Sequence, residues 1–307
     1  MLPSFQPLSS SPDLQSAFAR LSRRGFAGES LDETLRQLTA ATGQLLNMER
    51  VSLWGLTAHQ QILECIDLYE LSRNRHSSGA ILHAARYPAY FRALSRGEPI
   101  VADDALTHPY TQEFADDYLL MNGISALISS PIHVNGELQG TLRIERVGSH
   151  SNWTSVQRLF AHAVTNLVSL ALLQHQIVLI EEELNDTKCL HQALFVGTRD
   201  AIVISDAHTG HILDANPQAE KLFGRQIQEL LGILQSELHA TSPGRDVDQQ
   251  FRVLRDDKEI AAVRSEVISR DGKIIPVEIT GQVVHLEKGK RVFQGVFRPL
   301  SAAANAT

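Results

Sequence analysis

The sequence predicts an α+β protein of two domains, each with a central antiparallel sheet flanked by helices, and with a long helix joining them. Three observations lead to this fold class. The chain has 307 residues, which is more than one typical domain. Strand-like segments separated by short turns occur in both halves. An uninterrupted helical pattern begins near Trp153 and separates the two halves.

Composition narrows the classes of partner. The chain is 43% hydrophobic and 21% charged, with a net charge of -7. Because phosphate binding needs a basic surface, we expect no nucleic-acid partner. The N-terminus lacks the features of a secretion signal and the apolar runs are too short to span a bilayer, so we expect a cytoplasmic protein without a membrane partner. Cys65 and Cys189 fit neither a disulfide framework nor a zinc site, and we expect no metal.

The first domain is expected over residues 28–175, after a flexible lead-in at residues 1–27. Its last two strands are joined through Asn135 and Gly136, a pair that supplies the positive φ angles of a type I′ hairpin. The pattern predicts helices at 30–47 and 111–123 and strands at 50–57, 61–70, 99–105, 125–134 and 137–147.

The second domain is expected over residues 190–300, followed by a tail at 301–307. It opens with SDAHTGHILDANPQAEKLFG, which reads as two strands around a turn and then a helix. Asn216 suits the helix N-cap and Pro217 the first helical position, and Gly224 suits the helix end. Farther on, the pattern predicts a helix at 246–256 and hairpins around Asp271-Gly272 and Lys288-Gly289.

Several segments of the first domain resemble a GAF domain of the kind found in multidomain bacterial signalling proteins. They are DLYE, HSSG, YPAYFRAL, IVADDA, EFADDYL, GISA, SSPI, VNGELQG and FAHAVTNLVSLAL, in this order. The resemblance implies a sensory module that holds a small ligand between the sheet and the long loops on one face. It does not imply catalysis.

Strand 137–147 departs from the GAF pattern. In G-T-L-R-I-E-R-V-G, Arg143 and Arg146 stand where relatives have Cys and His, while Glu145 is retained. Metal, haem or thiol chemistry tied to those two positions is therefore not expected. Strand alternation places Arg143 and Glu145 on one face and Arg146 on the other. Arg143 either pairs with an anionic ligand, pairs with Glu145, or faces solvent.

The loop between strands 61–70 and 99–105 carries further candidates for the ligand pocket. Loops on a rigid sheet commonly supply binding groups, although aromatic residues at helical spacing also close a core. The two histidines are too isolated to be metal ligands. The candidates in this loop are His76, His83, Tyr87, Tyr90 and Phe91.

Residues 170–194 are expected to form the connecting signalling helix. Spacings of three and four alternate along one apolar stripe, as in a coiled coil. The stripe either packs on the two domains or pairs with the same helix of a second copy, and a parallel homodimer is the preferred interpretation. Its apolar members are Leu170, Leu173, Ile177, Ile180, Leu184 and Leu194, with Thr187 and His191 as polar members.

The second domain resembles a PAS domain, through DAN-x-x-AE-x-LFG, RDGK-x-x-PVEI and FQGVFRPL. The resemblance implies a module that binds a small molecule or dimerises, and that relays signals through flanking helices. The flavin-binding Asn-Cys-Arg-Phe motif is missing, and Val247 stands where haem-binding relatives have their axial His. Flavin and haem are thus disfavoured, the cofactor is unknown, and His239 is expected to be exposed.

These resemblances predict a sensory protein that binds a small ligand or a partner and relays the signal through the connecting helix. Homodimerisation and a downstream signalling protein are the expected interactions. No phosphoacceptor, cyclic-dinucleotide or nucleotide-binding motif occurs in the sequence, so we expect no enzyme activity in these residues. One alternative is the regulatory part of a diguanylate cyclase or histidine kinase whose catalytic module lies elsewhere. Another is a ligand-free dimerisation adaptor.

Overall fold

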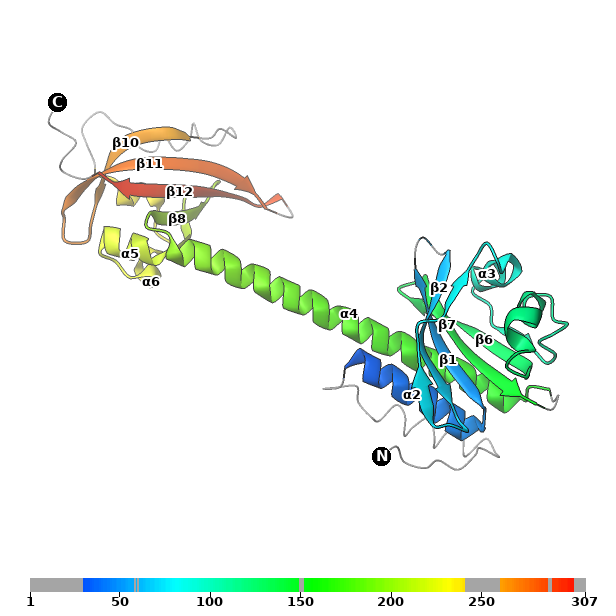
Figure 1. Cartoon of the computed structure of the whole chain (residues 1–307). Helices are drawn as coiled ribbons and strands as arrows, with labels where there is room; N and C mark the ends of the chain where they lie inside the picture. Colours follow the sequence, from blue (N-terminus) through cyan, green and yellow to red (C-terminus); the bar gives the residue numbers. More distant parts are fainter. Residues whose placement is uncertain are drawn as a thin grey trace. The chain divides into compact units, whose positions relative to one another are not determined.

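The computed structural model describes residues 30–57, 59, 61–148, 152–240, 260–286 and 289–300 (Figure 1). It divides into two compact units between Glu181 and Glu182. The predicted lead-in at 1–27, the predicted helix at 246–256, Lys288 of the last hairpin and the tail at 301–307 all lie outside the described residues.

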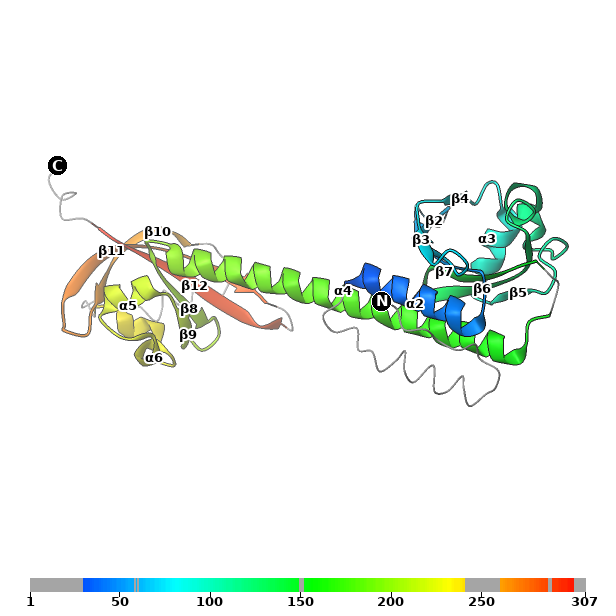
Figure 2. The same ribbon diagram turned by 60° about the horizontal axis from the view of Figure 1, so that its bottom comes forward.

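The first unit contains one antiparallel sheet of seven strands. Their order is β3-β2-β1-β7-β6-β5, with β4 also paired to β2 (Figures 1 and 2). At the β6–β7 turn, Asn135 and Gly136 have φ angles of 53° and 82°, which confirms the predicted hairpin. The strands are β1 (Arg50–Thr57), β2 (Ile62–Glu70), β3 (Arg75–Ser77), β4 (Ile81–His83), β5 (Ile100–Ala102), β6 (Ile124–Val134) and β7 (Glu137–Val147).

Helices cover both faces of this sheet. On one face lie α2 (Leu31–Leu46) and the first part of α4 (Ser155–Gly197), side by side in Figures 1 and 2. Their apolar residues form one core with the sheet, which includes Leu38, Leu45 and Phe160. On the other face lie α3 (Pro88–Leu94), the 3-10 helix η1 (Gln112–Phe114) and the π-helix η2 (Ala115–Leu119).

The segment 111–123 is not the regular helix that the sequence predicts. A 3-10 turn is followed directly by a π-helical turn, and π-turns are frequent at functional sites. With this backbone, Phe114, Tyr118 and Leu119 all pack into the core on this face of the sheet. The change of helix type therefore serves to bring three large side chains against the sheet.

A β-bulge at Ile66 divides β2 into two halves and reverses the face of the sheet toward which its alternate side chains point. Trp54 pairs with Cys65 and Leu53 pairs with Asp67, so Ile66 has no counterpart on β1. Because an extra residue reverses the alternation of side chains, Cys65 faces the α3 side of the sheet and Asp67 faces the α2 side.

The second unit contains a five-stranded antiparallel sheet in the order β10-β11-β12-β8-β9. Short helices cover one face of it, and Phe223 and Phe297 meet edge to face in the core, with centroids 5.5 Å apart. The elements are β8 (Ala201–Asp206), β9 (Ile212–Ala215), α5 (Pro217–Phe223), α6 (Ile227–Leu230), η3 (Gln235–Leu238), β10 (Ile260–Ile268), β11 (Ile274–His285) and β12 (Arg291–Pro299).

Asn216 is a buried joint of the second unit as well as the predicted N-cap of α5. Its Oδ1 accepts hydrogen bonds from the backbone N–H groups of Ala219, at 3.0 Å, and Ile202, at 2.9 Å. Its Nδ2 donates to the carbonyl of Asp200, at 2.9 Å, and to that of Phe195 in the last turns of α4, at 3.1 Å. One side chain thus ties α4, β8 and α5 together.

We therefore expect Asn216→Ala to lower the free energy of unfolding of the second unit by about 2 kcal/mol, because buried backbone groups lose their partners. Both tryptophans, Trp54 and Trp153, belong to the first unit, so far-UV circular dichroism in urea is the suitable measurement. Ser30→Ala removes the N-cap of α2, which makes a single 3.3 Å hydrogen bond in an exposed position. If Asn216→Ala and Ser30→Ala lowered the free energy of unfolding equally, the additional hydrogen bonds of Asn216 would contribute no stability beyond its N-cap.

Helix α4 corrects one expectation from the sequence. It contains an 18-residue window with a mean hydropathy of 1.6, and it is the one helix among the described residues that is long and apolar enough to cross a membrane. The expectation that no segment has this length and composition is therefore wrong. Phe160, Val164 and Val168 are buried in the core under the first sheet, which accounts for the apolar character of the first part of α4.

Candidate functional site

The candidate site is centred on Arg143, on the face of the first sheet that α3, η1 and η2 cover. Its side chain is fully buried. Its Cζ atom lies over four aromatic rings, at 5.2 Å from the centroid of Trp54, 5.7 Å from Tyr90, 5.2 Å from Phe114 and 5.0 Å from Tyr118. We call these four residues the aromatic box. They come from β1, α3, η1 and η2, so the box exists only when all four elements pack together.

Glu145 is the counter-ion at the edge of the aromatic box. Its Oε1 lies 2.9 Å from Nη2 of Arg143, and its Oε2 lies 3.1 Å from Nε of Arg50. The hydroxyl of Tyr118 donates to the same carboxylate at 2.8 Å. Burial by itself would lower the pKa of Arg143, but the acidic groups around it, Glu145 foremost, together outweigh burial, and the pKa lies above its ordinary value. Arg143 is therefore a permanent buried cation.

Burial raises the pKa of the Tyr118 hydroxyl well above its usual range, and the charge of Glu145 adds to this shift. Tyr118 is therefore a neutral donor to Glu145. Among the guanidinium atoms of Arg143, Nε, Nη1 and Nη2 are buried and make no hydrogen bond of good geometry. The ion pair with Glu145 and the four ring faces are the interactions that hold this cation.

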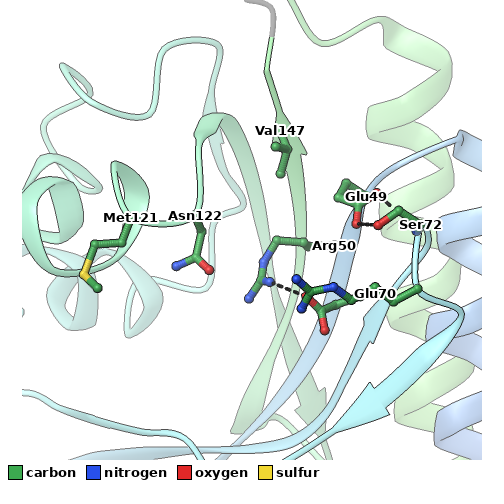
Figure 3. Close-up of a pocket in the computed structure, with 8 residues that line it drawn as sticks. Glu49, Arg50, Glu70, Ser72, Met121, Asn122 and Val147 are labelled. Atoms are coloured by element: carbon green, nitrogen blue, oxygen red, sulfur yellow. Dashed lines mark hydrogen bonds and ion pairs between the residues drawn. The ribbon is translucent and has the colours of Figure 1, made fainter.

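A cleft of about 470 Å³ opens next to this network, and Figure 3 shows its lining. Arg50 reaches from the cleft toward Glu145 and also pairs with Glu70 at 3.1 Å. Burial would raise the pKa of Glu70, but Arg75, Arg50 and Arg73 more than offset it and lower the pKa. Met121 and Asn122 stand on the opposite side of the cleft (Figure 3). Glu49, Ser72, Arg73 and Val147 complete the lining.

Some of the predicted site residues meet here. Arg143 and Glu145 lie on one face, as alternation predicts, and they pair with each other. Tyr90 is in the aromatic box, and its hydroxyl bonds to Ser129 at 2.8 Å. Tyr87 is not one of the four box residues, but its ring packs on that of Phe114, with the two centroids 4.3 Å apart.

The two predicted histidines lie apart from the aromatic box. His76 pairs with Tyr69 across β2 and β3, so it shares the α2 side of the sheet, where its Nδ1 lies 3.0 Å from Asp67. The bulge at Ile66 is the reason, because it turns Asp67 and Tyr69 to that side. His83 is exposed on β4, opposite Ile62.

Sequence reasoning missed Arg50, Trp54, Phe114 and Tyr118. Alternation along β1 could have placed Arg50 and Trp54 on one face. No local signal marks Phe114 or Tyr118, because their orientation depends on the 3-10 and π turns.

The predicted stripe on α4 is accessible in its second part. The exposed fractions of its side chains are 47% at Ile177, 64% at Ile180, 51% at Leu184 and 64% at Leu194. Leu170 is also exposed, and Leu173 is half-buried. An apolar surface of this extent on one helix is typical of an interaction surface.

A second, smaller cleft of about 230 Å³ lies between β6 and α4 on the other face of the first sheet. Its lining includes His133 from β6 and His162 from α4. Among the residues whose positions are described, no three His, Cys, Asp or Glu side chains gather closely enough to hold a metal ion.

In the second unit, His239 differs from expectation. It is partly buried, with its Nδ1 3.4 Å from the hydroxyl of Ser265 and its ring centroid 6.0 Å from that of Phe297. Burial lowers the pKa of His239 to about 4. The expectation that it is exposed is therefore wrong, because η3 carries it against β10 and β12.

The low pKa of His239 predicts that the second unit becomes less stable as the pH falls. Unfolded His titrates near 6.5, so between pH 6.5 and 4 the unfolded state binds the proton more readily, and stability is lost as the pH falls. Between pH 7 and pH 5 we expect His239 to cost the second unit about 2 kcal/mol. Urea unfolding by circular dichroism at both pH values should show a smaller loss in His239→Gln. An identical loss would mean that His239 titrates normally.

Comparisons with known proteins agree with this architecture. Residues 30–172 match the GAF domain family and residues 199–301 match the PAS domain family. No curated protein matches the chain.

Among solved structures, the chain is similar to the PAS domain of an HTR-like protein from Haloarcula marismortui, with 27% identity over 39% of this chain and 97% of that one and a TM-score of 0.35. It is similar to the GAF domain of a phosphoenolpyruvate-protein phosphotransferase from Coxiella burnetii, with 15% identity over 55% and 98% and a TM-score of 0.45. It is also similar to the phycocyanobilin-bound GAF domain of a cyanobacterial phytochrome, with 17% identity over 55% and 98% and a TM-score of 0.47.

The GAF match lies within the first unit and the PAS match lies within the second. The chain therefore contains a GAF domain at residues 30–172 followed by a PAS domain at residues 199–301.

Proposed function

We propose that this chain is a cytosolic bacterial sensory protein whose GAF domain binds a small polar molecule in the cleft over Arg50. Binding is relayed through α4 to the PAS domain of a homodimer. The observation that supports this most strongly is the position of Arg50. It lines the cleft and also pairs with the buried Glu145, at 3.1 Å. A ligand that pairs with Arg50 competes with Glu145 and so changes the charge balance around Arg143.

The cleft favours a ligand with both donor and acceptor groups. Its charged side chains are two carboxylates, Glu49 and Glu70, and two guanidinium groups, Arg50 and Arg73. Ser72 and Asn122 add uncharged polar groups. Such a lining suits a zwitterionic or similarly polar molecule, since a strongly charged ligand of either sign meets repulsion from one of the pairs.

Strand β7 connects the cleft to α4. Glu145 faces the cleft side of the sheet, and the next residue, Arg146, faces the other side. There Arg146 lies 4.8 Å from the ring centroid of Trp153 and donates to Gln157 in the first turn of α4 at 3.4 Å. A ligand that shifts Glu145 therefore moves the residue that holds the start of α4.

Native mass spectrometry of the purified full chain tests the binding step. We expect a small-molecule adduct in the wild type that disappears in Met121→Trp, because the indole fills the cleft from an exposed position. Leu120→Trp is the matched control, since Leu120 is also exposed but does not line the cleft. Absence of any adduct, or an adduct that persists in Met121→Trp, would contradict the site.

The homodimer rests on the α4 stripe, whose three-and-four spacing lets two copies pair with the same face. We expect Ile180→Asp to shift the molar mass measured by light scattering from dimer to monomer. Val178→Asp is the control, because Val178 is 48% exposed on the same helix but lies outside the stripe. If Ile180→Asp and Val178→Asp were both monomers, or both dimers, the α4 stripe would not be the dimer surface.

Disulfide cross-linking tests the relay. In a Cys189→Ser background, which removes the exposed native thiol of α4, Ile177→Cys places a reporter on the stripe. The relay requires that the cleft ligand changes the rate at which this cysteine cross-links two copies. A ligand that binds and leaves this rate unchanged rules the relay out.

A further inference from the structure

Arg143 fills a site that has the chemistry of a cation-binding pocket. Four aromatic rings lie within 5.0–5.7 Å of its Cζ atom, and a buried carboxylate lies 2.9 Å from Nη2. Cages of aromatic rings recognise ammonium-type cations through the negative potential of the ring faces. Four ring contacts on one guanidinium place this cation in a cage of ring faces that comes from four separate elements.

The polar atoms around the box favour the same conclusion. The indole N–H of Trp54 donates to Ser52 at 2.8 Å, and the hydroxyls of Tyr90 and Tyr118 bond to Ser129 and Glu145. These groups are satisfied by the sheet, so they leave the box lined by ring faces. The Nε and both Nη atoms of Arg143 make no hydrogen bond of good geometry, although a guanidinium carries five N–H donors and Glu145 lies 2.9 Å from Nη2 as an ion-pair partner. A site built for Arg143 as a hydrogen-bonded structural residue would supply well-aligned acceptors to several of these donors.

We propose that the aromatic box and Glu145 form a binding site for an organic cation of the guanidinium or alkylammonium class, and that the Arg143 side chain is its intramolecular occupant. With Arg143 in this site, the aromatic box stays closed around a cation although no separate cation is bound. An external signal acts on it through Arg50 and Glu145 at the adjacent cleft. This inference concerns the interior of the domain and does not depend on the identity of the cleft ligand.

The proposal predicts chemical rescue. Arg143→Ala removes the part of the side chain that N-ethylguanidinium replaces. In the full-length variant we expect saturating N-ethylguanidinium to raise the melting temperature of the GAF domain by about 5 °C or more, followed by tryptophan fluorescence. N-ethylurea has the same shape without the charge, and we expect it to bind at least about tenfold more weakly. The wild type, whose site is full, should not respond to either compound.

Arg146→Ala is the matched control, because Arg146 stacks on one ring, Trp153, in a partly exposed position on the other face of the sheet. It should show no rescue. Equal stabilisation of Arg143→Ala by N-ethylurea, or no stabilisation by N-ethylguanidinium, overturns the proposal.

A second comparison keeps the proposal testable if Arg143→Ala does not fold. Arg143→Lys and Arg143→Met both keep an unbranched chain in the box, and the first also keeps a cation. If the box is a cation site, the Lys variant melts at the higher temperature. If it is an ordinary apolar core position, the Met variant is at least as stable, because apolar residues commonly replace buried ions without loss.

Discussion

Glu145→Ala should lower the free energy of unfolding of the GAF domain by about 3–5 kcal/mol, since breaking a buried ion pair leaves an uncompensated charge. Glu145 is fully buried, and Arg143, Arg50 and the hydroxyl of Tyr118 all converge on it. Arg143 cannot remove its uncompensated charge by losing its proton, because guanidinium groups do not deprotonate in proteins. Urea unfolding followed by tryptophan fluorescence measures the loss, because both tryptophans lie in the GAF domain.

The control for this experiment is an ion pair on the same domain that lies in solvent. Arg86 and Asp117 pair with exposed side chains, and screening by water makes such pairs contribute little. Asp117→Ala should therefore unfold at nearly the urea concentration of the wild type. A Glu145→Ala variant with a similarly unchanged midpoint would show that the buried pair does not form in solution.

Gly140→Ala should destabilise the GAF domain by more than about 3 kcal/mol, because a side chain at this position has no room. A Cβ atom on Gly140 would lie 1.9 Å from the carbonyl oxygen of Trp54, and no rotation of a side chain relieves a clash with backbone. The β1–β7 pairing, in which Gly140 stands opposite Gly55, would have to open. The same urea measurement applies.

Gly197→Ala separates this clash from a general effect of removing glycine. Gly197 is the last residue of α4, and a Cβ atom there would meet nothing within 4 Å. Alanine is the better helix former, so this variant should keep or slightly increase stability, and because Gly197 belongs to the second unit this is measured by far-UV circular dichroism in urea. If Gly140→Ala were tolerated equally well, β1 and β7 would have to be more loosely paired at this point than their register indicates.

Local signals predicted much of the fold. Asn135-Gly136 predicts its hairpin because both positions need positive φ angles, and Asn216-Pro217 predicts the start of α5 because both residues suit a helix N-terminus. The continuous helical period predicts α4. In these cases the determining interactions lie within a few residues of one another along the chain.

The aromatic box required the tertiary structure. Alternation along β7 places Arg143 and Glu145 on one face, but Phe114 and Tyr118 reach them through a 3-10 turn and a π turn whose backbone has no local signature. His76 is a similar case, because one bulged residue on β2 sends its partners to the α2 side. A hydrogen-bond shift of one residue changes little locally and reverses every side chain beyond it.

By itself, the sequence determined the periods, the caps and the turns, and hence two sheet-and-helix domains joined by one helix. These features depend on backbone angles that neighbouring residues set. Only the tertiary structure decided which side chains meet, because a buried cation such as Arg143 is stable only where Glu145 and rings from four separate elements converge on it.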